Sequence, residues 1–115
     1  MKDQLYLLRP GFMNAGMGPL YCSDSAPVEG VLSFFPQLRV LVDIHYLEFP
    51  RPRKALIEAL GESNQSLPVL ILAPERQLKD QELEPSQVNG KVFFTDEKSI
   101  RHYLSTQYNL PVASE

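Results

Sequence analysis

A run of five consecutive apolar residues at positions 69–73 (VLILA) constrains the fold of this 115-residue chain more than any other feature. A strand that faces solvent on one side alternates apolar and polar residues, whereas a strand covered on both sides is apolar throughout. We therefore expect this segment to be a central strand. The chain has a single cysteine, so no intrachain disulfide can hold its layers together. A chain of this length can bury a sufficient core without one, as a single domain spanning residues 1–115.

Three further apolar segments predict three more strands. They are residues 4–9 (QLYLLR), 38–49 (LRVLVDIHYLEF) and 91–94 (KVFF), of which the second is rich in β-branched and aromatic residues. Residues 10–21 carry three glycines and two prolines and predict a long loop. Residues 74–90 are polar and weakly patterned, so we expect a surface excursion that closes with the hairpin signal Asn89-Gly90.

Helical periodicity appears in three of the remaining segments. The first contains an apolar stripe at the spacing i, i+3, i+4 and i+7, formed by Val28, Val31, Leu32 and Phe35. This helix is expected to begin one or two residues after Cys22, at the N-cap candidates SDS, and to end at Pro36. The second helix opens with the stretch RPRK and ends at Gly61, and the third is capped by Thr95 or Asp96.

The order of these elements, β-α-β-α-β-β-α, defines the expected topology. The first two strands and the helix between them form a right-handed βαβ unit, so the two strands are parallel. The last two strands are expected to join through a hairpin and to run antiparallel. We predict a four-stranded mixed sheet with helices on both faces. The strand at residues 69–73 is expected to pair with residues 4–9 on one side and with residues 91–94 on the other. The strand at residues 4–9 is expected to pair also with residues 38–49.

Composition excludes several classes of function. The net charge is −3 with no basic excess, which disfavours nucleic-acid binding. No apolar run approaches 20 residues, and the N-terminus lacks the apolar core of a signal peptide, so we expect no membrane segment. A single cysteine fits a reducing cytoplasm and excludes cysteine-rich zinc sites. His45 and His102 lie on different expected elements without a second ligand at metal spacing, so we interpret both as structural and expect no metal.

Three features then fall at related places in the expected fold. Cys22 precedes the first helix, Pro68 immediately precedes the central strand, and Asp96 caps the last helix. This arrangement resembles the thioredoxin superfamily, and the stretches SLPVLIL and FFTDEKSIRHYL are similar to glutaredoxins and to the N-terminal domains of glutathione transferases. The resemblance implies an α/β thioredoxin-like fold. The stretches RPGF, YCSDSAPVEGVLSFFP, FPRPRKALIEALGESNQSLPVL and FFTDEKSI also resemble a bacterial family of unassigned activity, domain of unknown function 3088.

Cys22 is the candidate reactive residue. A thiol at a helix N-terminus meets partial positive charge and free amide donors, which favour the nucleophilic thiolate. In dithiol relatives a resolving cysteine lies three residues further on, and Ser25 replaces it here. The resemblance therefore implies monothiol chemistry, with glutathione or a protein thiol as the second thiol. Asp24 opposes a thiolate, and the alternative is that Cys22 is a small, partly buried residue without chemistry.

The resemblance also implies a set of ligand-binding residues. Pro68 would follow a cis peptide bond, and Leu67 would present its backbone to a bound peptide or glutathione, whereas the alternative is an ordinary trans proline at a strand start. Thr95 and Asp96 would hold the γ-glutamyl end of glutathione, or Asp96 is a plain N-cap. A basic cluster comprises Arg51, Arg53 and Lys54. It would bind the glycyl carboxylate at the other end of glutathione, or it would remain solvated.

Charge argues against tight glutathione binding. Asp24 and Glu97 both place negative charge where an anionic ligand would lie, and Glu97 stands where the transferases have a serine. We therefore expect glutathione affinity no tighter than roughly millimolar. Our first hypothesis is a thioredoxin-fold protein with a monothiol redox or thiol-binding site at Cys22. The alternatives are a non-catalytic protein-interaction module with the same fold, and a transferase-like binding domain without its helical partner domain.

Overall fold

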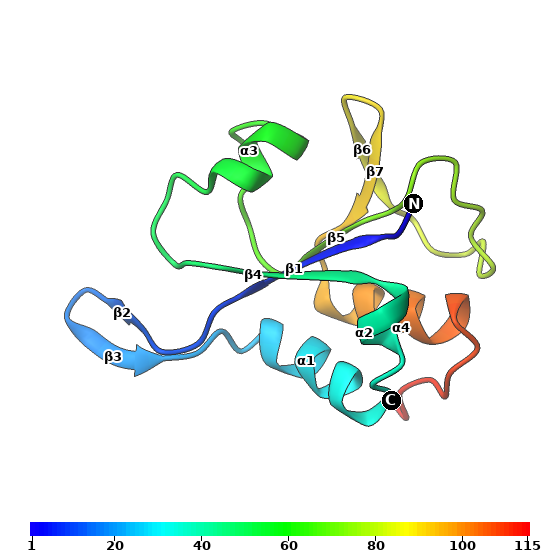
Figure 1. Cartoon of the computed structure of the whole chain (residues 1–115), viewed down its shortest axis with the longest axis horizontal. Coiled ribbons are helices and arrows are strands. Elements are labelled where there is room, and N and C mark those ends of the chain that lie inside the picture. The colour runs from blue at the N-terminus through cyan, green and yellow to red at the C-terminus, as the bar shows by residue number, and fades with distance from the viewer.

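The apolar segment that begins at residue 69 lies in the middle of the sheet, as expected. In the computed structural model, which describes residues 1–115, β5 (Val69–Ile71) pairs on one side with β1 (Gln4–Leu8) and on the other with β7 (Lys91–Phe94). The outer strands are β4 (Asp43–Leu47) and β6 (Ser86–Val88), which gives the order β4-β1-β5-β7-β6 (Figure 1).

The helices cover both faces of this sheet. α1 (Ser25–Phe34), α2 (Leu38–Leu41) and α4 (Glu97–Gln107) pack on one face, and α3 (Lys54–Leu60) packs on the other (Figure 1). β5 shows why its segment is apolar throughout. Leu70 belongs to the core under α1 and α4, while its neighbours Val69 and Ile71 belong to the core under α3.

The strand pairings agree with those expected from the sequence. β1 is parallel to β4 and antiparallel to β5, and β5 is antiparallel to β7. The α/β class and the mixed sheet are therefore confirmed. None of the helices is both long enough and apolar enough to cross a membrane. The peptide bond between Leu67 and Pro68 is cis, as the resemblance implied.

The expected number of four strands is wrong, because the sheet has a fifth strand, β6, within the segment assigned to a surface excursion. Asn89 and Gly90 do form a tight turn, with φ angles of 49° and 76°. That turn joins β6 to β7. The hairpin signal was therefore correct, but it connects a different pair of strands from the β5 and β7 pair that we expected.

The expected strand at residues 38–49 is also only partly correct. Its first four residues form the short helix α2, and the strand itself begins at Asp43. Leu38 and Val42 are both almost fully buried, and the Val42 N–H donates to the Leu38 carbonyl. One helical turn brings two residues four positions apart onto the same face, so packing overrides the β-propensity of this segment.

Residues 10–21 form a hairpin where a loop was expected. β2 (Phe12–Asn14) pairs antiparallel with β3 (Met17–Leu20), and we call this pair the hairpin arm. The turn at its tip uses Ala15 and Gly16, with φ angles of 52° and 76°. The arm extends away from the main sheet (Figure 1) and is attached at its base by stacking of the Phe12 and Phe49 rings, whose centroids are 4.4 Å apart.

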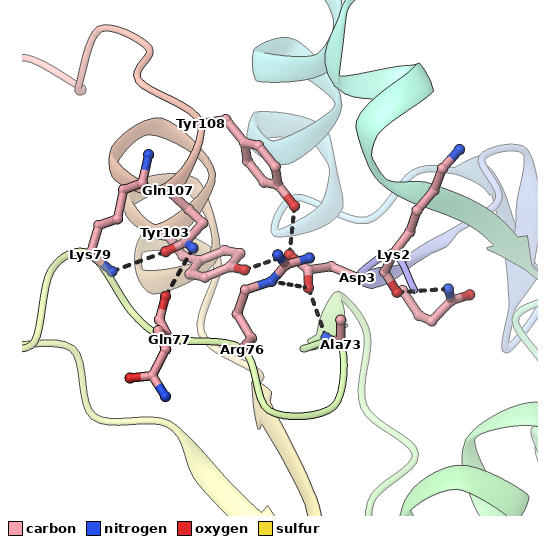
Figure 2. A network of polar contacts seen from close by, with 10 residues as sticks. Lys2, Asp3, Ala73, Arg76, Gln77, Lys79, Tyr103, Gln107 and Tyr108 are labelled. Carbon is pink, nitrogen blue, oxygen red and sulfur yellow. Dashed lines mark hydrogen bonds and ion pairs between the residues drawn. The ribbon is translucent and has the colours of Figure 1, made fainter.

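A buried carboxylate that the sequence analysis did not single out ties the N-terminus to the rest of the core. Asp3 is fully buried, and its Oδ1 accepts from the Ala73 N–H at 2.8 Å and from Arg76 Nε at 3.2 Å (Figure 2). Its Oδ2 accepts from the hydroxyls of Tyr103 and Tyr108. Four donors therefore satisfy this charge inside the protein, which offsets the cost of burying it.

Candidate functional site

Cys22 lies three positions before Ser25, the first residue of α1, and is half-buried. Its carbonyl accepts from the Ala26 N–H at 3.1 Å, and its Sγ accepts from the Ser25 N–H at 3.4 Å. Asp24, which is the N-cap residue by position, makes no capping hydrogen bond with its side chain. The sulfur atom of Cys22 therefore takes the place of the capping oxygen at the start of α1, where the helix favours negative charge.

Ser25 has a structural task in this arrangement. Its side chain is buried, and its hydroxyl accepts a hydrogen bond from the Leu8 N–H at 3.2 Å. This bond satisfies a backbone donor at the end of β1 and fixes the first turn of α1 against that strand. Ser25 thus binds β1 through its hydroxyl and the Cys22 sulfur through its N–H.

A pocket of ≈ 330 Å³ opens beside Cys22. It is bounded by the end of β1, the base of the hairpin arm, the first two turns of α1 and Tyr46 of β4. Glu29 on α1 is the only charged residue in its lining. Neither Glu29 nor Tyr46 was predicted from the sequence. The one local signal was that Glu29 lies four residues after Ser25, on the same face of the helix.

Glu29 and Tyr46 of the pocket lining form a connected polar triad with Arg39. One carboxylate oxygen of Glu29 accepts from the Tyr46 hydroxyl, and the other accepts from Arg39. Arg39 Nη1 also donates to the Tyr46 hydroxyl oxygen at 3.2 Å. Burial, together with the bond to Glu29, raises the pKa of Tyr46 above its usual value of 10.0, so its hydroxyl remains protonated near neutral pH.

The basic cluster divides into exposed and buried members. Arg51 and Lys54 are exposed, whereas Arg53 is 8% exposed and precedes α3. The guanidinium of Arg53 donates to the carbonyl of Gln65 at 2.7 Å and to that of Phe49 at 2.6 Å, and its Nε has no partner. No carboxylate pairs with this buried cation.

Arg53 is the member of the cluster that is electrostatically linked to Cys22. Burial lowers the pKa of Arg53 and the charge of Arg51 lowers it further, while the negative charge of a Cys22 thiolate acts in the opposite direction. Arg53 is therefore close enough to sense the charge of Cys22. The exposed Arg51 takes no part in the pocket beside the thiol.

The remaining predicted ligand residues lie apart from this pocket. Pro68 is buried, and Leu67 packs against the core under α3. Thr95 is exposed and lines a separate pocket of ≈ 290 Å³. Asp96 caps α4, because its Oδ2 accepts from both the N–H and the hydroxyl of Ser99 at 2.9 Å. The pocket beside Cys22 thus includes Ser25 but none of these four residues.

The two histidines and Glu97 have local partners. His45 Nε2 contacts Gln4 Oε1 at 2.7 Å, and His102 Nε2 contacts Asp80 Oδ2 at the same distance. Glu97 pairs with Arg101, one turn further along α4, at 2.7 Å. The negative charge of Glu97 is therefore compensated within its own helix.

Comparison with known proteins gives a family but no activity. The model of a family described as protein of unknown function (DUF3088) matches residues 2–112. No curated protein and no solved structure matches the chain. Since the family match spans nearly the whole fold described above, the chain belongs to the DUF3088 family of proteins of unknown function.

Proposed function

We propose that this protein is a thioredoxin-like monothiol protein in which Cys22 exchanges with the thiol or disulfide of glutathione or of another protein. The observation that carries the proposal is the hydrogen bond from the Ser25 N–H to Cys22 Sγ at the start of α1. A thiolate at this place gains from the helix dipole and from the amide donor. A single thiol of this kind suits a reducing compartment, and we place the protein in the cytoplasm.

The proposed reaction is thiol–disulfide exchange. The Cys22 thiolate attacks one sulfur of a disulfide R–S–S–R′, a new Cys22–S–S–R bond forms, and R′–S⁻ leaves with the electron pair of the broken bond. Ser25 cannot resolve this mixed disulfide, because its hydroxyl is no substitute for a thiolate and already binds the Leu8 N–H. A second thiolate from solution must attack the Cys22-bound sulfur of R to restore Cys22.

Glutathione itself is expected to bind weakly. No Lys or Arg lines the pocket beside Cys22, and the exposed Asp24 adds a negative charge next to the thiol. Arg53 is the buried cation within electrostatic reach, and its guanidinium is already held by two backbone carbonyls. We therefore keep our expectation of an affinity no tighter than roughly millimolar.

A non-catalytic interaction module is the second candidate. Two of the residues proposed for ligand binding already have structural partners, since Asp96 caps α4 and Arg53 joins the carbonyls of Gln65 and Phe49. The hairpin arm also leaves Met13, Met17 and neighbouring Tyr21 exposed, which fits a surface that contacts another protein. In this case Cys22 would be an ordinary half-buried residue.

Alkylation of the single thiol by iodoacetamide, followed by intact mass across a range of pH, separates the two candidates. The matched control is the double variant Cys22→Ala/Ser33→Cys, which moves the thiol to an exposed position in the last turn of the same helix. We expect Cys22 to react about fivefold faster at neutral pH, because a helix favours negative charge at its start and opposes it at its end. A slower reaction at Cys22 than in the control would favour the interaction module.

A further inference from the structure

The pocket beside Cys22 has the size and lining of a site for a small molecule. Its volume of ≈ 330 Å³ is at the lower end of the range for such sites, which starts at about 300 Å³. Leu7, Leu8, Pro10 and Ala26 give it mainly apolar walls. Such walls favour an apolar body and leave few places for a polar group.

Two groups of the pocket lining matter most for an occupant, namely the thiol of Cys22 and the carboxylate of Glu29. The Cys22 thiol is at the start of α1, and Glu29 projects into the pocket from the second turn of the same helix. The two residues are seven positions apart, and the Ala26 N–H binds the Cys22 carbonyl as in a helical turn, so their backbones lie about 10 Å apart along the helix axis. An occupant that contacts both groups must therefore be elongated, with its sulfur at one end and a polar group at the other.

The part of the pocket next to Glu29 favours a neutral hydrogen-bond donor. Arg39 compensates the charge of Glu29, and the Tyr46 hydroxyl is protonated, so the triad carries no net charge. Each carboxylate oxygen of Glu29 accepts one hydrogen bond from the triad and has a further lone pair available. A hydroxyl or amide N–H can donate to that lone pair, whereas an ionised carboxylate has no proton to donate to it.

We infer that this pocket binds the body of a neutral, elongated and mainly apolar thiol or disulfide that carries a hydroxyl or amide at the end remote from its sulfur. This inference rests on the proposed function, because it supplies the substrate for exchange at Cys22. The thiolate attacks the sulfur attached to the bound half, the Cys22–S–S–R bond forms, and the other half leaves as a thiolate. The apolar chain of the bound half then lies along α1, with its donor at Glu29.

Two disulfides of similar size test the inference. Bis(hydroxybutyl) disulfide is neutral and ends in donors, whereas dithiodibutyrate is its doubly charged carboxylate counterpart. The rate of mixed-disulfide formation at Cys22 is followed by intact mass, and each rate is divided by that of mercaptoethanol with the same disulfide. We expect the normalised rate to be at least about tenfold higher for the neutral disulfide, which corresponds to about 1.4 kcal/mol.

A variant that reduces the volume of the pocket provides the control. Ala26→Leu places a larger side chain in the pocket at a helical position that tolerates leucine. Ser33→Leu adds the same side chain to an exposed position of α1 outside the pocket. We expect Ala26→Leu to remove the preference for the neutral disulfide and Ser33→Leu to keep it, where the preference is the ratio of the two normalised rates within each variant, so that a change in thiol reactivity cancels.

These experiments test the pocket inference and the proposed function separately. If Cys22 alkylates rapidly but both disulfides react at equal normalised rates, the pocket inference is wrong and the proposed function stands. The same conclusion follows if the preference for the neutral disulfide survives Ala26→Leu. If Cys22 alkylates no faster than the Ser33→Cys control, the proposed function fails. The pocket is then judged with the unreactive probe bis(hydroxybutyl) sulfide. Shifts of the backbone amide signals of Ala26, Glu29 and Tyr46 that Ala26→Leu abolishes support the site, and no shifts overturn it.

Discussion

At the scale of single residues, Asp3 is the clearest case of a side chain whose importance depends on distant partners. It is fully buried and accepts four hydrogen bonds from Ala73, Arg76, Tyr103 and Tyr108 (Figure 2). An isolated carboxylate in this place would be strongly unfavourable, so the surrounding donors determine whether the N-terminal segment can stay in the core.

We predict that Asp3→Asn lowers the free energy of unfolding by about 3 kcal/mol. The asparagine NH₂ group would face partners that are themselves hydrogen-bond donors, and Arg76 would lose its charge partner. Urea denaturation at neutral pH measures the change. Asp43→Asn is the control, since Asp43 is half-exposed and its ion pair with Lys2 spans 3.9 Å. The control should change stability by less than about 1 kcal/mol. A similar loss in both variants would contradict the role of Asp3.

The contrast between Asp96 and Asp3 shows which residues a sequence can identify. Asp96 caps α4 through Ser99, three residues away, so its role was predictable from a local pattern. The partners of the Asp3 side chain lie at least 70 residues away, and those of Arg53 lie in two separate segments. Only the folded chain brings such groups together, and Glu29 of the pocket was missed for the same reason.

At the scale of elements, the start of α4 distinguishes a structural cap from a ligand-binding site. Asp96 accepts two hydrogen bonds from Ser99, and Glu97 pairs with Arg101. Both acidic side chains at this helix start are thus engaged within the helix itself. We therefore expect substitutions here to affect stability and to leave chemistry at Cys22 unchanged.

Asp96→Ala should lower the free energy of unfolding by about 1 kcal/mol, because the N-cap acceptor is lost and a backbone N–H of the first turn loses its partner. Lys98→Ala, at an exposed position of the same turn, serves as the control and should be close to neutral. Thermal unfolding followed by circular dichroism measures both. The alkylation rate of Cys22 should equal that of the parent protein, and a clear decrease in Asp96→Ala would instead connect this helix start to the thiol site.

Elements with a strong internal pattern were predictable, and those that depend on packing were not. β5 and α1 follow from an unbroken apolar run and from an i, i+3, i+4, i+7 stripe. α2 was hidden in a segment of high β-propensity, because only the burial of Leu38 and Val42 favours the helical turn. The hairpin arm was hidden by its glycines and prolines, which are equally typical of loops.

At the scale of the whole molecule, the network around Asp3 connects three parts of the chain. It joins the segment before β1, the loop at residues 73–76 that follows β5, and α4 with its C-terminal neighbour Tyr108 (Figure 2). Because these parts are far apart in sequence, the network can persist only while the whole fold is intact. Its protonation equilibria should therefore appear in the stability of the entire domain.

The tyrosines of this network give the stability a specific dependence on alkaline pH. Burial first, and then the hydrogen bond to Asp3, raise the pKa values of Tyr103 and Tyr108 well above their usual 10.0 in the folded state. In the unfolded chain both ionise near the usual value. Their contribution to stability is therefore fully present below pH of about 10, and it is lost as the pH rises from there toward the raised values.

We predict that the free energy of unfolding falls less steeply above pH 10 in Tyr103→Phe than in the parent protein. Each tyrosine that is held neutral only in the folded state contributes a slope that approaches about 1.4 kcal/mol per pH unit as the pH rises above 10, and phenylalanine removes one such group. Urea denaturation at several pH values between about 9 and 11.5 measures the slope. Tyr103→Phe also removes a bond to Asp3 and so lowers stability at neutral pH, but this loss does not change the slope.

Tyr21→Phe is the control, because Tyr21 is 70% exposed at the base of the hairpin arm and should leave the slope unchanged. Equal slopes in the parent and Tyr103→Phe would mean that the folded protein ionises Tyr103 as readily as the unfolded chain, and the buried network would then not determine alkaline stability.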